Sequence, residues 1–235
     1  MAMASPTMRL SALVFLAIWV VMMVAMMFPA AAPMILTFHT VQASKRRRGD
    51  AFVATWIFVA AYMLVWSVSG VGAYAGALSA QALARWAALP SSATARIGGG
   101  MLVAAGVYQL TPLKDFCLSK CRTPLGFIVA SWRDGISGAL QMGLRHGVYC
   151  LGCCWLLFLI LFPLGMMNVA AMAIITLLIF AEKTLPWSRP IARTTAAALV
   201  AYGIAVVAAP RLLPTFMPDM TATIPAAPMN MGTMH

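Results

Sequence analysis

Residues 143–155 read GLRHGVYCLGCCW and hold three of the five cysteines and one of the three histidines of the chain. In a helix, successive side chains are about 100° apart. One face would therefore carry several soft donors within about 80° of arc: Met142, His146, Cys150 and Cys153, with Cys154 beside them. These donors suit Cu(I) or Zn(II) and disfavour Mg²⁺ and Ca²⁺. The stretch predicts a helix with a soft-metal site, although cysteines that only pack and a histidine that only makes a hydrogen bond would give the same pattern.

The composition excludes an ordinary soluble domain. Of 235 residues, 63% are hydrophobic and 9% are charged, whereas about a quarter of the residues of a soluble domain are charged. The net charge is +11, but the basic residues lie in short loops between apolar runs, where they orient a chain in the membrane. We therefore expect a multi-pass membrane protein whose partner is the lipid bilayer and not nucleic acid.

Six apolar segments predict an all-α transmembrane bundle. A helix rises about 1.5 Å per residue, so about 20 residues cross the hydrocarbon layer. The first segment starts at Leu10 and continues through Pro29 and Pro33 to Gln42, as one long kinked helix would. We expect a single bundle over 1–213 and a flexible Pro- and Met-rich tail over 214–235. The five later segments are 51–80, 97–110, 135–163, 168–181 and 194–213, with 113–133 as a loop between the third and fourth.

The distribution of basic residues predicts the orientation of the bundle. Short cytoplasmic loops are enriched in Lys and Arg. Loops one, three and five hold most of them: Lys45, Arg46, Arg47, Arg48, Lys114, Lys120, Arg122, Arg133, Lys183, Arg189 and Arg193. The opposite side holds Arg9, Arg85, Arg96 and Arg211. This bias places both termini outside, which in a bacterium means the periplasmic side of the inner membrane.

Methionines form two groups of candidate ligands. One group crowds the first segment before Pro29, and the other lies where the fourth segment passes into the fifth. Thioethers are soft and neutral, so they can hold Cu(I) in lipid without adding charge, and they discriminate against zinc. Alternatively, methionine fills gaps between packed helices. The candidates, which favour copper over zinc, are Met22, Met23, Met26, Met27, Met166 and Met167.

Cys117 and Cys121 form a second pair of candidate ligands, four residues apart in the expected third loop. The charge bias puts this loop on the cytoplasmic side, where thiols stay reduced, so a structural disulfide is not expected. Neighbouring Lys120 and Arg122 favour the thiolate, the form that binds metal. We interpret the pair as a thiolate clamp with a metal or redox role.

Other polar residues have simpler interpretations. Glu182 and Lys183 are expected to form an interfacial pair in which the lysine side chain extends to the membrane surface. Arg145 should lie near the inner interface or pair with an acid: Asp115, Asp134 or Glu182. The tail segment 229–235 has three methionines and a histidine, which could capture copper outside the cell or have no role. His39 is more consistent with a helix end than with a ligand.

The sequence resembles a family of bacterial integral membrane proteins described as predicted metal-binding. The resemblance covers most of residues 15–185 and implies a multi-span protein with a metal site built from Met, Cys and His positions. The segments that carry it are Trp19 with Met23 and AMMFP at 25–29, then Pro33; YQLTPLK at 108–114 with Cys117 and Cys121; GL at 143–144 with HG at 146–147, Cys150 and GCCW at 152–155; GMMN at 165–168 with Met172; and EK at 182–183.

Two functions follow from the sequence. In the first, the protein binds Cu(I) at sites in the bundle and handles or delivers it, with a periplasmic or membrane protein as candidate partner. In the second, the site is a copper centre in a subunit of a membrane-bound oxidase or electron-transfer complex, with Tyr108, Tyr149 and Trp155 as candidate contacts. The sequence does not decide whether the protein is an enzyme. A membrane thiol–disulfide exchanger is less consistent with it, because the cysteines are expected on the reducing, cytoplasmic side.

Overall fold

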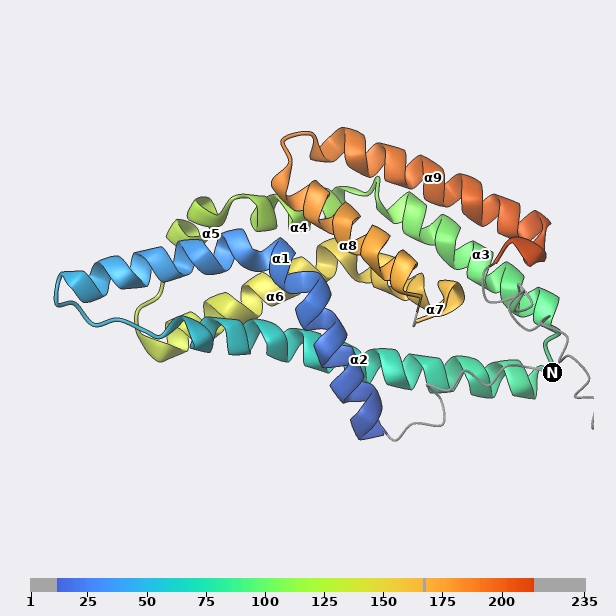
Figure 1. The fold of residues 1–235 in the computed structure, drawn as a ribbon, viewed down its shortest axis with the longest axis horizontal. Coiled ribbons are helices and arrows are strands. Elements are labelled where there is room, and N and C mark those ends of the chain that lie inside the picture. Colours follow the sequence, from blue (N-terminus) through green and yellow to red (C-terminus); the bar gives the residue numbers. More distant parts are fainter. Residues whose placement is uncertain (1–11, 167, 214–235) are drawn as a thin grey trace, which may run out of the picture.

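The computed structural model describes residues 12–166 and 168–213, and within these ranges all regular structure is helical. Every apolar segment expected to span the membrane contains a helix (Figure 1). The elements are α1 (Ala12–Arg47), α2 (Thr55–Trp86), α3 (Ser91–Tyr108), α4 (Pro112–Arg122), α5 (Pro124–Ser131), α6 (Gly135–Leu159), α7 (Leu161–Leu164), α8 (Val169–Thr184), α9 (Ser188–Ala208) and the 3₁₀ turn η2 (Pro210–Leu212).

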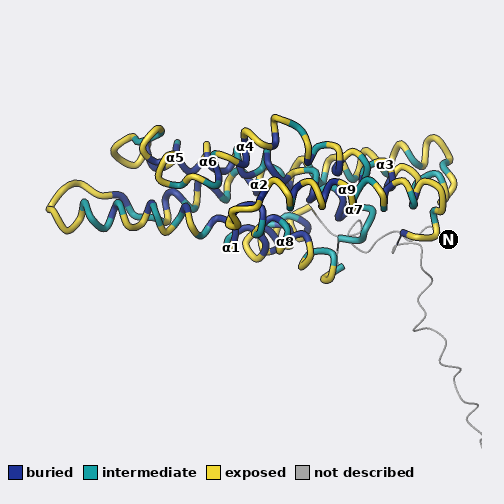
Figure 2. Tube along the Cα trace, turned by 90° about the horizontal axis from the view of Figure 1, so that it is seen from above, coloured by how far each residue is buried: buried dark blue, intermediate teal, exposed yellow. Residues whose placement is uncertain are grey.

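Four helical stretches are long and apolar enough to cross a membrane, which suggests a membrane protein. They are α1, α2, Gly135–Leu164 and α9. The outer faces of the bundle carry large apolar side chains, whereas buried residues lie where helices meet (Figure 2). A large exposed apolar surface is unfavourable in water and favourable in lipid. Of the two other expected spans, α8 has 16 residues and α3 has 18.

Helix α1 runs unbroken for 36 residues through Pro29 and Pro33, so the prediction of one long helix is confirmed. Figure 1 shows it changing direction along its length as it crosses α2. A proline lacks the backbone N–H that a straight helix needs, and its ring displaces the preceding turn. The bend brings the N-terminal half of α1, with its methionines, across the bundle.

Helices α2 and α6 approach closely because glycines of α6 face α2. A Cβ atom on Gly143 would lie 2.4 Å from the backbone oxygen of Phe58, and one on Gly147 would lie 2.8 Å from the Val65 side chain. Small residues at such contacts let the two backbones come together. Helices α3 and α9 pair in the same way, through Gly99 and Gly203. The α2–α6 contact sets one side of the candidate site.

The expectation of a loop over 113–133 is wrong, because this segment forms helices α4 and α5. Thr111 caps α4 by accepting a hydrogen bond from the backbone N–H of Lys114, and Pro112 occupies the first turn, where its missing N–H costs nothing. Pro124 starts α5 in the same position. Lys114, Lys120 and Arg122, which suggested a loop, therefore lie on α4, and Arg133 lies between α5 and α6.

Candidate metal centre

All five cysteines of the chain are buried and free of disulfides, and they lie where α4 meets α6. One buried cluster contains Cys117 and Cys121 of α4 together with Cys150, Cys153 and Cys154 of α6. The Cys117 sulfur lies against the bare backbone of Gly152, 2.9 Å from where a Cβ would stand. The structure therefore joins two predicted sites into one cluster, and the separate loop clamp expected for Cys117 and Cys121 is replaced by a contact with α6.

Cys150 is the centre of this cluster and is fully buried. Its sulfur lies 3.1 Å from the hydroxyl oxygen of Tyr62, on α2, and accepts a hydrogen bond from the ammonium of Lys183, on α8, at 2.9 Å. Helices α2 and α8 thus direct polar groups at a single sulfur atom of α6. A charged donor makes the stronger kind of hydrogen bond, so the Lys183 contact favours an electron-rich sulfur.

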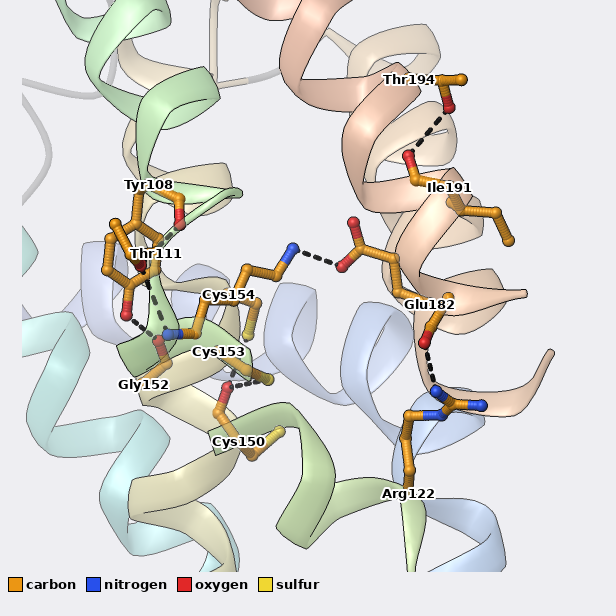
Figure 3. A network of polar contacts seen from close by, with 12 residues as sticks. Tyr108, Thr111, Arg122, Cys150, Gly152, Cys153, Cys154, Glu182, Ile191 and Thr194 are labelled. Carbon is orange, nitrogen blue, oxygen red and sulfur yellow. Dashed lines mark hydrogen bonds and ion pairs between the residues drawn. The ribbon is translucent and has the colours of Figure 1, made fainter. Parts of the chain in front are cut away.

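The Cys153 and Cys154 thiols donate hydrogen bonds to the backbone carbonyl of Cys150, at 3.1 Å and 2.8 Å (Figure 3). Such bonds to the preceding turn are the local alternative for a small polar side chain inside a helix. Rotation about the Cα–Cβ bond of either residue would release its sulfur toward a ligand.

The predicted methionines of α1 belong to the same apolar core as the cysteines. Met22, Met23, Met26 and Met27 are at most 8% exposed and belong to the apolar core that contains the five cysteines. Met166 is partly buried and packs against this core. The structure therefore places the first methionine group and the cysteines in one apolar core. Met167 lies outside the described residues, as does the tail with its predicted copper-binding segment 229–235.

His146 is 2% exposed and lies among aromatic rings. Its ring stacks on Tyr62 and Phe58, with centroids 5.5 Å and 6.0 Å away, and meets Phe127 edge-on at 5.7 Å. Neither ring nitrogen has a hydrogen-bond partner. A buried imidazole without a partner is unusual, so both nitrogens remain available to a ligand. Met142, one turn away, is also buried.

A buried ion pair lies beside the cluster. The Lys114 ammonium donates to the Glu182 carboxylate at 2.6 Å, and both side chains are almost fully buried (Figure 3). The expected surface pairing of Glu182 with Lys183 is wrong, because the end of α8 packs against α4 and α6 and places Glu182 against Lys114. Lys183 consequently points inward, toward Cys150, and not to the membrane surface.

The structure also shows the contacts of the polar residues Arg145, Asp134 and His39. Arg145 is exposed, and within the described residues it forms none of the expected ion pairs. Asp134 pairs instead with Lys45 at 2.5 Å. The expectation that His39 caps the end of the first helix is wrong, because α1 continues to Arg47; the His39 Nδ1 lies 3.2 Å from the hydroxyl of Thr55, the first residue of α2.

Within the described part of the chain, no three His, Cys, Asp or Glu side chains form a ready metal-binding group. A cavity of about 270 Å³ lies away from the sulfur atoms and is lined by Asn168 and by apolar residues of α6, α8 and α9. The cysteine cluster is thus closely packed as it stands.

Sequence reasoning missed several polar residues of the site. Lys183, Lys114 and Glu182 had a signal, since ionisable residues within or beside apolar segments often mark functional sites. Tyr62 had none, because a tyrosine in an apolar run is also a common packing residue.

The fold and this cluster define an all-helical protein, suggested to be membrane-bound, with a buried group of cysteine and methionine sulfurs. The family model described as "PpoB2: Copper chaperone" matches residues 16–206. The chain belongs to this copper chaperone family, and the matched range contains all the candidate ligands. No curated protein and no solved structure matches the chain.

Proposed function

We propose that this protein is an integral membrane copper chaperone that holds Cu(I) at the cysteine–methionine cluster and delivers it to a partner. The observation that carries the proposal is that the packing of α4 on α6 brings all five cysteines into one buried cluster. Soft sulfur donors from separate parts of the chain meet in the core of a protein from a copper chaperone family. Thiolates and thioethers are the ligands that favour Cu(I).

The chemistry of the cluster favours copper over zinc. Zinc sites usually take four thiolate, imidazole or carboxylate ligands in a tetrahedron. The α1 side of this core supplies thioethers instead, with Met23 and Met27 fully buried. Thioethers add no charge, so they suit a monovalent ion in an apolar environment. The proposed ligands are Cys121, Cys150, Cys153 and Cys154, with α1 methionines completing the site.

We propose secondary roles for the remaining predicted ligands. His146 keeps both ring nitrogens unpaired one turn before Cys150. We propose that His146 and Met142 bind the ion on one side of the thiols. Cys117 and the 166–167 methionines are proposed as contacts along the path of delivery.

The proposed resting state is closed, and binding requires side chains to rotate. In the closed state the Cys153 and Cys154 thiols donate to the Cys150 carbonyl. These are ordinary hydrogen bonds of about 1 kcal/mol net. The free energy lost with these two hydrogen bonds is small compared with the free energy of binding a soft metal to thiolates. Because the ion is cargo, it has to be released again. A rotation of the thiols that is easily reversed favours this release.

We also propose that six helices cross the bacterial inner membrane and that both termini face the periplasm. The basic bias of loops one, three and five supports this orientation. Helices α3 and α8 would then cross with the four longer ones, α3 paired with α9 through glycine contacts. A periplasmic or membrane protein is the proposed recipient of the copper.

Cu(I) titration of the full chain in mild detergent, without oxygen, tests the proposal. Cys150→Ser and Cys121→Ser should each lower the affinity by more than about tenfold, an effect seen even when a partner of a ligand is lost. Met23→Leu should weaken binding, whereas Met101→Leu on α3, outside the cluster, should not. X-ray absorption of the bound copper should show sulfur neighbours.

The outcome also separates delivery from catalysis. A chaperone should transfer its copper to a chelator or acceptor without consuming oxygen. An oxidase centre, the alternative from the sequence, should consume oxygen in a way that disappears in Cys150→Ser. If wild-type protein takes up no Cu(I), or if the cysteine variants bind it equally well, the proposal is wrong.

A further inference from the structure

Lys183 is a buried cation whose hydrogen-bond acceptor is a sulfur atom. Its side chain is on the last turn of α8, the residue is 7% exposed, and its ammonium lies 2.9 Å from the Cys150 sulfur. Within the described residues it forms no salt bridge with a carboxylate. A buried ammonium is costly unless a negative charge balances it.

The charged groups near Lys183 have other partners, so the counter-charge for its ammonium has to come from the cysteines. Glu182 is the acid next in sequence, but its carboxylate is paired with Lys114 at 2.6 Å. That pair is neutral as a unit. Arg122 points elsewhere, because it donates to the Leu185 carbonyl at 2.8 Å and to the Ser188 hydroxyl. The charge of the sulfur site is therefore set by Lys183, the cysteines and whatever ion they bind.

We propose that Lys183 determines the charge specificity of the copper site, an inference that rests on the proposed function. As part of this proposal, two of the four cysteine ligands are thiolates in the metal-bound state, so that together with the Lys183 ammonium they carry a charge of −1. A monovalent ion such as Cu(I) brings this total to zero, whereas a divalent ion such as Zn(II) brings it to +1. Thioether ligands are neutral and leave the count unchanged. A net charge in an apolar interior is unfavourable, so the lysine favours Cu(I) over Zn(II).

The contact geometry lets Lys183 act without binding the metal. A thiolate sulfur has several lone pairs, so Cys150 can bind an ion and still accept the hydrogen bond from the ammonium. Tyr62 approaches the same sulfur at 3.1 Å but is neutral. Lys183 is thus a positioning residue that acts through Cys150, as outer-sphere partners of metal ligands do.

The experiment compares Cu(I) and Zn(II) affinities of the full chain in detergent, measured by competition with chelators for each metal. Lys183→Met should lower the ratio of Cu(I) to Zn(II) affinity by about tenfold or more, the range typical for an outer-sphere partner. Lys183→Arg keeps the charge and should retain most of the ratio. Arg193→Met makes the same charge change at an exposed position of α9, outside the cysteine cluster, and should leave the ratio at the wild-type value.

Helix content and monodispersity of each variant show whether it is folded. Equal losses of Cu(I) and Zn(II) affinity in Lys183→Met would indicate a structural role and overturn the inference, as would an unchanged ratio. If Lys183→Met does not fold, the comparison of Lys183→Arg with Lys183→Gln replaces it, and equal ratios in those two would also overturn the inference. Absence of Cu(I) binding by the wild type would instead refute the proposed function.

Discussion

The hydroxyl of Tyr62 on α2 lies 3.1 Å from the sulfur of Cys150 on α6, in the fully buried centre of the bundle. Because the two residues are 88 positions apart, this contact exists only when α2 and α6 pack in one register. It ties the candidate site to the helix pair that Gly143 and Gly147 bring together.

Tyr62→Phe should destabilise the protein by about 1 kcal/mol, the net value of one buried hydrogen bond. The ring and its stacking on His146 remain, so the change isolates the hydroxyl. Thermal unfolding in detergent measures the effect. Tyr74→Phe is the matched control, since within the described residues no hydrogen bond of the Tyr74 hydroxyl is found, and it should leave the midpoint nearly unchanged.

Gly143→Ala should destabilise the α2–α6 contact by about 1–3 kcal/mol, as overpacking of a tight interface does. The added methyl group would stand 2.4 Å from the Phe58 carbonyl oxygen, which is backbone and cannot move aside easily. Gly100→Ala on α3 meets open space and should stabilise its helix by up to about 1 kcal/mol. Equal unfolding midpoints for these two variants would contradict the packing described here.

Glu182→Gln should destabilise the protein by about 3–5 kcal/mol, because it leaves the Lys114 ammonium buried without a counter-charge. The double variant Lys114→Met/Glu182→Gln removes both charges and should recover most of the loss. Denaturant unfolding of the single and double variants gives the coupling energy between the two sites. A double variant no more stable than Glu182→Gln would show that the pair is not the source of the effect.

The Lys45–Asp134 pair makes a prediction about pH at the end of the bundle. Hydrogen bonds from Lys45 and Trp132 hold the pKa of Asp134 below its usual value. A lowered folded-state pKa stabilises the folded form above the unfolded pKa, and this contribution is lost as the pH falls through the folded value. Lys45→Met should raise the pKa of Asp134 toward its usual value, as NMR titration of the carboxyl carbon can measure. No rise would contradict the pairing.

Much of the fold was predictable, because apolar runs and their periodicity depend on local sequence. The long α1 with its two prolines and the helical segments around 135–163 and 194–213 follow directly from length and hydropathy. The charges of the 113–133 segment favoured a loop in the sequence analysis. Two local signals, the Thr111 cap and Pro112 at the first turn, indicate the helix that the structure shows. Apolar composition therefore predicts the long helices better than it predicts where a short helix starts.

The site was predictable in its chemistry and less so in its assembly. The α6 cysteines share one face because of helical spacing, and copper as the associated metal agrees with the family. The meeting of the α4 and α6 cysteines in one cluster depends on how α4 packs, which no local pattern encodes. The inward direction of Lys183 likewise depends on Lys114 occupying the Glu182 carboxylate. Such long-range competition between partners becomes visible only in three dimensions.

The glycine contacts between α2 and α6 hold one half of the site rigid, whereas the half on α4 can move more easily. Tyr62 and Cys150 stand on two backbones in direct contact, so their separation can change little. Cys121 stands on an 11-residue helix with a proline at its own start and another at the start of α5. A shift of α4 should therefore accommodate an ion of different radius. This shift would change the surface of the molecule according to whether the ion is bound.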